Sequence, residues 1–179
     1  MNDNQVIIQL IGAIEAGLTL FNIENVEVLQ GYQPTQQGIP EGDAIFIHKI
    51  PSRHYGHPKE KNVYNQETGQ FDQTREFIRL SKWQINARAQ QRPDDIMGLT
   101  ASDLVEAVAD ILNMQESRDS LSASGIGIER IAEIRIAYDG NEKERFEQEP
   151  SCDIVLNHKK TYTSTVRRIE RGELNINRV

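Results

Sequence analysis

The chain has 179 residues, of which 37% are hydrophobic and 6% aromatic, and its formal net charge at pH 7 is −7. This length suits one compact domain with a long loop or terminal arm. The acidic balance argues against sequence-independent binding of nucleic acid, which needs basic surface. No apolar run is long enough to cross a bilayer, and a single cysteine, Cys152, excludes an intrachain disulfide. No basic cluster precedes the N-terminal apolar stretch, which argues against a secretory signal.

The N-terminal part predicts a helix and two strands. Apolar residues recur at spacings of three and four over residues 4–21, which indicates an amphipathic helix that Asn2 or Asp3 can cap. A short strand follows around residues 26–28, and glycines and prolines make residues 30–43 a loop. Residues 44–50 are almost continuously apolar, which favours a strand in a central position of the sheet.

The middle of the chain predicts a long strand between two less regular segments. Residues 51–69 lack a hydrophobic period and contain Pro and Gly, so either a long loop or an extended hairpin fits them. Residues 74–89 form a strand with Phe77 and Trp83 on one face and a bulge or twist near Ser81. A second helix begins after Thr100 in a capping box, and its buried stripe consists of Leu104, Val105, Val108, Ile111 and Leu112.

The C-terminal part predicts a third helix and further strands. The helix covers residues 116–123, an alternating strand covers 126–138, and residues 144–158 form its partner, with Pro150 at a bulge or edge. Residues 162–169 fit a last strand or an arm. The order predicts an α+β fold in which the N-terminal helix and two central helices pack on one face of a mainly antiparallel sheet. The domain covers residues 1–161, with a projecting loop or hairpin at 51–69 and a C-terminal strand or arm at 162–179.

No catalytic, metal or cofactor site is predicted. His54 and His57 are three residues apart, a spacing that suits metal ligands only on a helix, and Gly56 and Pro58 argue against a helix there. Cys152 lacks the flanking glycines of a nucleophile elbow, so we interpret it as a small, half-buried strand residue. The other histidines are His48 and His158, which we interpret as strand residues.

The distribution of charge favours contact between copies of the chain. No Lys or Arg occurs before Lys49, whereas six acidic residues do, and residues 159–179 contain six basic residues against two acidic ones. Opposite ends of this kind suit head-to-tail association. The candidate protein-interface residues are Arg53, Tyr55, Tyr64, Arg167, Arg168 and Arg171.

Five segments together resemble the tailed-phage neck and tail terminator family. They are residues 32–40 (YQPTQQGIP), 44–50 (AIFIHKI), 53–58 (RHYGHP), 99–105 (LTASDLV) and 145–158 (RFEQEPSCDIVLNH). Their order and spacing carry the resemblance, since none is a chemical motif.

The resemblance implies a virion protein, assembled in the host bacterial cytoplasm, that caps the tail tube as a hexameric ring. Such a ring ends tube polymerisation, contacts the tail tube protein and a head-completion protein, and has DNA only as passing cargo. It implies no catalytic residue, no cofactor and no membrane contact. The alternatives are a head–tail connector protein and, from other classes, a small enzyme that uses His54, His57 and nearby carboxylates, or a bacterial binding module.

Overall fold

The structure is a computed structural model that describes residues 1–31, 42–90, 98–140 and 146–166, with the backbone alone at 137–140 and 146–149. Its elements, in chain order, are α1 (Asp3–Leu20), β1 (Val26–Gln30), β2 (Asp43–Asn65), β3 (Gln70–Arg88), α2 (Ala101–Asn113), α3 (Gln115–Ala123), β4 (Ile126–Ile131), β5 (Arg135–Gly140) and β6 (Phe146–Val166). Most of the loop predicted at 30–43 lies outside the described residues.

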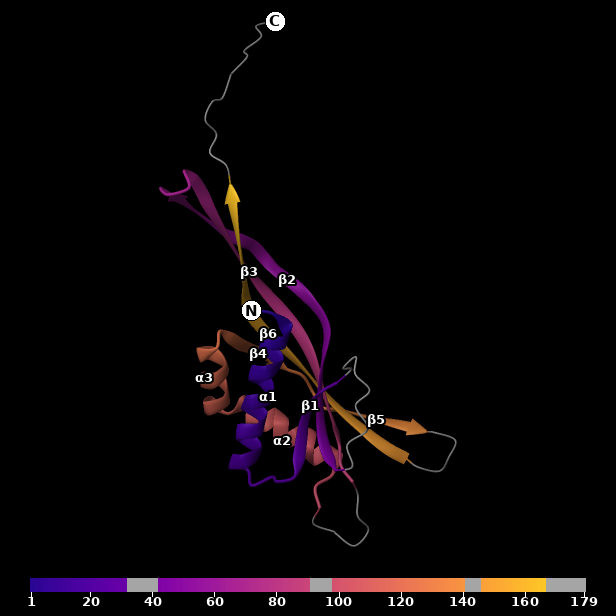
Figure 1. Ribbon diagram of the computed structural model, residues 1–179. Coiled ribbons are helices and arrows are strands. Elements are labelled where there is room, and N and C mark those ends of the chain that lie inside the picture. The colour runs from indigo at the N-terminus through magenta and orange to yellow at the C-terminus, as the bar shows by residue number, and fades with distance from the viewer. Residues whose placement is uncertain (32–41, 91–97, 141–145, 167–179) are drawn as a thin grey trace, which may run out of the picture.

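The described strands form one six-stranded sheet in the order β1-β2-β3-β6-β4, and β5 also pairs with β6. Only β1 and β2 are parallel, and every other pair is antiparallel. The three helices lie together beside the lower half of the sheet (Figure 1). The predicted α+β class, with helices on one side of a mainly antiparallel sheet, is therefore confirmed.

Both long helices begin at side-chain caps that the sequence predicts. Asn2 accepts a hydrogen bond from the backbone of Gln5 at 2.9 Å, and the Gln5 side chain accepts one from the backbone of Asn2 at 2.8 Å. Thr100 and Asp103 make the same reciprocal pair at 3.1 and 2.8 Å. These caps satisfy backbone N–H groups that have no partner inside the first turn, so each helix starts at a defined residue.

The core lies between the helices and one face of the sheet. The predicted stripe of α2 is buried, as are Trp83 and Ile85 of β3 and Ile154 and Leu156 of β6. The two longest helices approach closely at Gly17, where an added Cβ would overlap the Ile111 side chain. A glycine at this point lets α1 and α2 pack without a side chain between them.

The β2–β3 hairpin is long and interrupted twice. The register of β2 against β3 shifts between Lys49 and Ser52 and again between Tyr55 and Lys59, whereas β3 pairs with β6 without a shift. The irregularity predicted near Ser81 of β3 is therefore found in the opposite strand, β2. Pro51 lies between Lys49 and Ser52, where the first register shift occurs, and it has no N–H to donate to β3. Residues 51–65 belong to β2 and find backbone partners within the same chain, as a hairpin and not as a loop.

The single strand predicted at 126–138 is two strands. β4 pairs with β6 through Ile126–Ile131, and β5 pairs with β6 from Arg135 onward. Between them the Ala132 N–H donates to the Asp153 carbonyl at 2.8 Å, and the Cys152 thiol donates to the Ala132 carbonyl at 3.3 Å. The alternating pattern continues through this break, so the sequence pattern did not reveal it.

Candidate assembly interface

Beyond the helices the sheet continues as three strands, here called the arm: residues 52–65, 70–81 and 157–166, with the turn at 66–69. The arm rises away from the helical layer to the C-terminal end of β6 (Figure 1). At a strand rise of about 3.3 Å per residue, its length is roughly 40 Å. Its middle strand, β3, is paired on both sides, so the arm is an ordered platform.

The register assigns the side chains of the arm to two faces, because directly opposed residues of antiparallel strands point to the same side. Phe71 opposes Tyr64 and Val166, Arg75 opposes Tyr162, and the series leads through Phe77 to buried Trp83. The face that the helices cover lower down therefore continues onto the arm. We call this side the aromatic face: Tyr64, Phe71, Phe77, Tyr162 and Val166.

Ring contacts hold the aromatic face together. Tyr64 and Phe71 lie edge to face with centroids 5.3 Å apart, and Phe77 and Tyr162 do so at 5.7 Å. His54 adds a third edge contact with Phe77 at 6.2 Å. The Lys160 ammonium lies 5.3 Å from the centroid of the Tyr162 ring and lowers the pKa of its hydroxyl through a hydrogen bond. Interlocked rings of this kind form a stiff apolar surface.

Exposed apolar side chains concentrate on the arm. Of the twelve large hydrophobic side chains that are exposed in the described part of the chain, seven lie there. They are Tyr55, Val63, Tyr64, Phe71, Ile78, Tyr162 and Val166. Four of the seven, Tyr64, Phe71, Tyr162 and Val166, lie on the aromatic face, and Tyr55, Val63 and Ile78 lie on the opposite face. Scattered exposed apolar residues are ordinary, but a group of them on one face marks an interaction site.

The predicted interface residues do not form one cluster. Tyr64 lies on the aromatic face, whereas Arg53 and Tyr55 oppose Leu80 and Ile78 on the other face. Arg167, Arg168 and Arg171 lie outside the described residues. The sequence reasoning missed Phe71 and Tyr162. It placed Phe77 in the core beside Trp83, with which it does share a face, but Phe77 is half-buried and lies outside the buried core.

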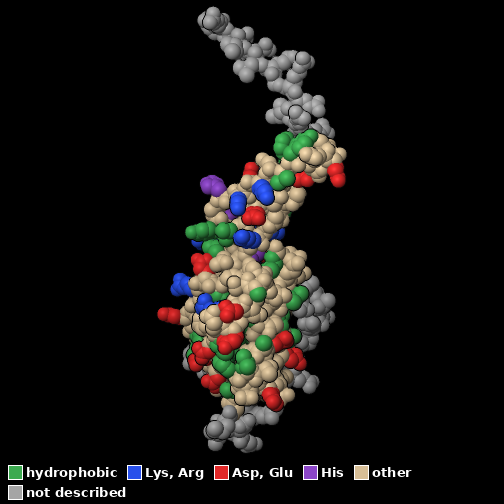
Figure 2. All heavy atoms as spheres, turned by 90° about the vertical axis from the view of Figure 1, so that its left-hand side faces the viewer, with side chains coloured by type: hydrophobic (Ala, Val, Ile, Leu, Met, Phe, Trp, Pro, Cys, Tyr) green, Lys and Arg blue, Asp and Glu red, His purple; other side chains and the backbone are tan. Residues whose placement is uncertain are grey.

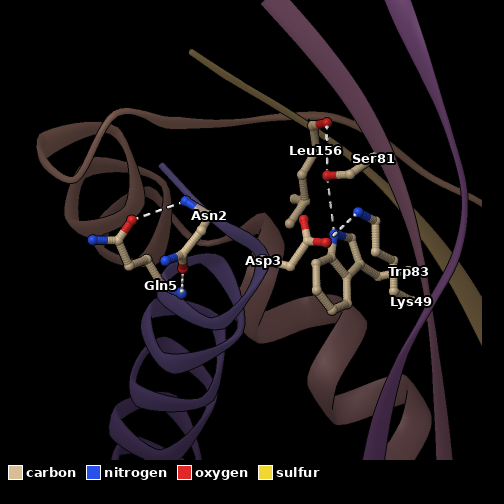
Figure 3. A network of polar contacts seen from close by, with 7 residues as sticks. All are labelled: Asn2, Asp3, Gln5, Lys49, Ser81, Trp83 and Leu156. Carbon is tan, nitrogen blue, oxygen red and sulfur yellow. Dashed lines mark hydrogen bonds and ion pairs between the residues drawn. The ribbon is translucent and has the colours of Figure 1, made fainter. Parts of the chain in front are cut away.

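The base of the arm is fastened to the helical body by polar contacts (Figure 3). The Lys49 ammonium pairs with the Asp3 carboxylate at 2.7 Å, and the Trp83 indole donates to the Ser81 hydroxyl at 3.0 Å. The N-terminal ammonium donates to the Lys159 carbonyl at 3.0 Å. Burial opposes ionisation of Asp3, but the Lys49 pair outweighs it and leaves the carboxyl pKa below its ordinary value. The start of α1 is thus tied to β2 just before the arm begins and to β6 within the arm.

The histidines and the cysteine stay apart. His158 is buried at the base of the arm, where desolvation lowers its pKa, and His54 contacts Phe77. In the described segments no three His, Cys, Asp or Glu residues lie close enough to hold a metal ion. Cys152 is buried rather than half-buried, and burial raises the pKa of its thiol, which opposes formation of a nucleophilic thiolate. No helix in the described segments is long and apolar enough to span a membrane.

Charge divides along the molecule. The helices α1, α2 and α3 carry seven acidic residues and one basic residue, Arg118. The arm carries seven basic and four acidic residues. Figure 2 shows Lys, Arg and His side chains on the arm and at its base, with some Asp and Glu side chains among them, and Asp and Glu side chains spread over the body below.

An aromatic and basic arm that the described helices leave uncovered, beside an acidic helical body, is typical of a protein that assembles with other proteins. The chain belongs to the E217 gateway protein gp29 family, whose profile matches residues 5–168. The resemblance to phage neck and tail terminator proteins is thereby confirmed. The chain is a structural protein of a tailed phage, and the prediction that it is no enzyme is confirmed by this membership.

Two other comparisons, with curated proteins and with solved structures, do not extend the family membership. No curated protein matches it. Among solved structures, it is similar to the sheath/tube terminator of an extracellular contractile injection system, PVC, in the extended state. The TM-score is 0.48 at 10% sequence identity, with 97% of this chain and 64% of that chain covered. The present chain therefore spans less than two thirds of the length of that protein.

Proposed function

We propose that the chain closes the end of the phage tail tube as an oligomeric ring and joins the tail to the neck. Its place would be the tail and neck of the virion, after assembly in the host bacterial cytoplasm. The observation that carries the proposal is family membership over residues 5–168 in a chain whose sheet extends into an uncovered arm. A hexamer is the ring size we expect, from the resemblance of its sequence segments.

The partners we propose are other copies of the chain, the tail tube protein and a head-completion protein. Exposed Tyr55 and Tyr64 and the adjacent Arg53 support contacts through the arm. DNA would pass through the ring as cargo, which the net charge of −7 supports because a basic wall would retain phosphates.

The C-terminal end supplies a second candidate contact. Arg167, Arg168 and Arg171 follow directly on the arm in the sequence. Changing all three to Glu should weaken contacts between subunits or with the neck, most strongly at low salt, because exposed charges are screened. Unchanged assembly and virion yield in the triple variant would show that these arginines are dispensable.

The experiment that tests the function is deletion of the gene in the phage, with tails imaged by electron microscopy. Loss of a protein that ends tube growth should yield tubes of irregular, excessive length that lack heads. Tails of normal length beside unjoined heads would instead support the head–tail connector. Negative-stain images of the purified chain should show rings with a central hole, and their absence at all concentrations would contradict the ring.

A further inference from the structure

We infer that the aromatic face of the arm docks on the outer surface of α1 and α3 in the next copy of the chain. This inference rests on the proposed function in so far as it takes the chain to be a ring subunit. It adds which surfaces meet, and that the contact is head-to-tail, with two unlike faces.

Within the described residues, nothing covers the aromatic face. Tyr162 and Phe71 are 46% and 36% exposed, although they continue the face on which Trp83 and Leu156 are buried under helices. The continuous pairing of β3 with β6, and the fastening of the base, hold the arm away from the helices of the same chain (Figure 1). The described part of the same chain therefore supplies no cover for this face, and we look for the cover in a second copy.

The outer surface of α1 and α3 is complementary to the arm in charge and in character. Glu15 of α1 and Glu116 and Asp119 of α3 are exposed, and α1 also exposes Ile8 to 61%. The Ser124 hydroxyl donates to the Gln9 side chain at 2.9 Å, which ties the end of α3 to α1 next to Ile8 in sequence. An acidic helical surface with an exposed apolar side chain matches an apolar surface that carries cations.

The cations on the aromatic face are available for such a contact. The Arg75 guanidinium pairs with the Glu60 carboxylate at 2.8 Å within the arm, whereas Arg79 and Lys160 make no ion pair with any carboxylate that the structure describes. On the helical layer the single basic side chain, Arg118, already donates to the Asn113 amide at 2.9 Å. The contact therefore brings cations that make no described ion pair in their own copy against carboxylates of the next, of which Asp119 accepts a hydrogen bond from the Gln115 amide at 2.7 Å.

The size of the face suits a contact that a ring repeats. Three strands about 4.8 Å apart and an arm of roughly 40 Å give a face of about 500–600 Å², below the approximately 800 Å² per partner of a standard interface. One such contact is weak by itself. In a closed head-to-tail ring each copy makes it twice, and closure holds every contact in place.

The first test uses a photo-crosslinking side chain, p-benzoyl-phenylalanine, in place of Tyr162 in the full chain. Equal amounts of ¹⁴N- and ¹⁵N-labelled protein are mixed and irradiated, and the crosslinked peptides are identified by mass spectrometry. We expect mixed-isotope crosslinks to α1 or α3. The matched control carries the same group at Thr163, on the opposite face of the same strand, and should give few of these crosslinks. Crosslinks to a second arm, or no mixed-isotope crosslink to α1 or α3, would overturn the inference.

The second test uses two variants that are each defective on one side. Lys160→Glu with Tyr162→Ser alters the arm, and Glu116→Lys with Asp119→Lys alters the helical layer. Each should weaken self-association at least about tenfold, as expected for central interface residues. Lys159→Glu with Thr163→Ser, which makes similar changes on the opposite face, should stay within about twofold of wild type.

Mixing the two defective variants decides between unlike and like faces. A head-to-tail contact leaves one intact pair of surfaces in the mixture, so light scattering should detect 1:1 dimers that do not grow into rings. No dimer in the mixture would overturn the inference. If wild-type rings form while crosslinks from Tyr162 are missing, the docking surface is wrong and the proposed function stands. If wild type shows no self-association at all, both fail.

Discussion

Replacing Trp83 by alanine should be among the most damaging single changes in this protein. Trp83 is the only tryptophan of the chain, and its side chain is 2% exposed at the point where the helical layer ends and the arm begins. Its indole donates to Ser81, whose hydroxyl donates in turn to the Leu156 carbonyl at 3.5 Å. Alanine would empty the space of the ring and remove the first link of this chain of hydrogen bonds.

The magnitude follows from these two losses. Truncation of a buried aromatic side chain to alanine costs about 3–5 kcal/mol, and a lost hydrogen bond costs about 1 kcal/mol. We expect the free energy of unfolding to fall by about 4–6 kcal/mol, and the Tm by roughly 8–24 °C for a domain of this size. Trp83→Phe keeps most of the ring but has no N–H, so it should cost about 1–2 kcal/mol.

Urea denaturation followed by far-ultraviolet circular dichroism measures these costs, because tryptophan fluorescence disappears with the residue itself. The contribution of the indole hydrogen bond comes from a double-mutant cycle of Trp83→Phe and Ser81→Ala. If Trp83→Ala unfolds within about 1 kcal/mol of wild type, the packing at the base of the arm is not what the structure describes. A Trp83→Phe variant as unstable as Trp83→Ala would show that the hydrogen bond outweighs the burial of the ring.

Three further predictions concern the helices and the thiol. Gly17→Ala should destabilise the protein by about 1–3 kcal/mol because its Cβ overlaps the facing helix. The control Gly12→Ala on the same helix has open space around it and should be neutral or stabilising by up to about 1 kcal/mol. Equal effects of the two variants in thermal denaturation would refute the close approach of α1 and α2. Thr100→Ala should cost about 1 kcal/mol at pH 7. Hydrogen bonds from Thr100 lower the pKa of Asp103, so the stability they contribute is present above the ordinary carboxyl pKa and is lost as pH falls through the lowered value. If Thr100→Ala costs as much stability in acid, below that lowered pKa, as it does at pH 7, this reasoning is contradicted. Cys152 should react slowly with Ellman's reagent at pH 8 in the native protein and rapidly in urea, since burial raises its pKa; rapid native reaction would mean that the strand is open.

The sequence predicted the helical layer well because its signals are local. The caps at Asn2 and Thr100, and the buried stripe of α2, depend on residues within a few positions of one another. A helix that shows a cap and a continuous apolar stripe has few other ways to pack.

The arm could not be recognised in the same way. Phe77 and Trp83 are six residues apart on β3, so their side chains point to the same face and look equivalent in the sequence. Trp83 is nevertheless buried in the core, whereas Phe77 is half-buried and belongs to the aromatic face. What distinguishes them is where the helical layer ends, and elements more than a hundred residues apart set that limit, as the contact between Met1 and Lys159 illustrates. Burial is a property of the tertiary structure, which an alternating pattern does not encode.

The two register shifts of β2 have a consequence for handling the isolated protein. Beyond Ile47, β2 has no described strand on its outer side, and an uninterrupted edge of that length would invite pairing with any passing strand. The shifts near Pro51 and Gly56 divide this edge into short runs, which protects it. The opposite edge, at 159–166 of β6, has no such interruption. Fibrous or disordered aggregates of the purified subunit should therefore grow from β6, and a proline introduced at an outward-facing N–H of that strand should keep the protein in solution without touching the aromatic face.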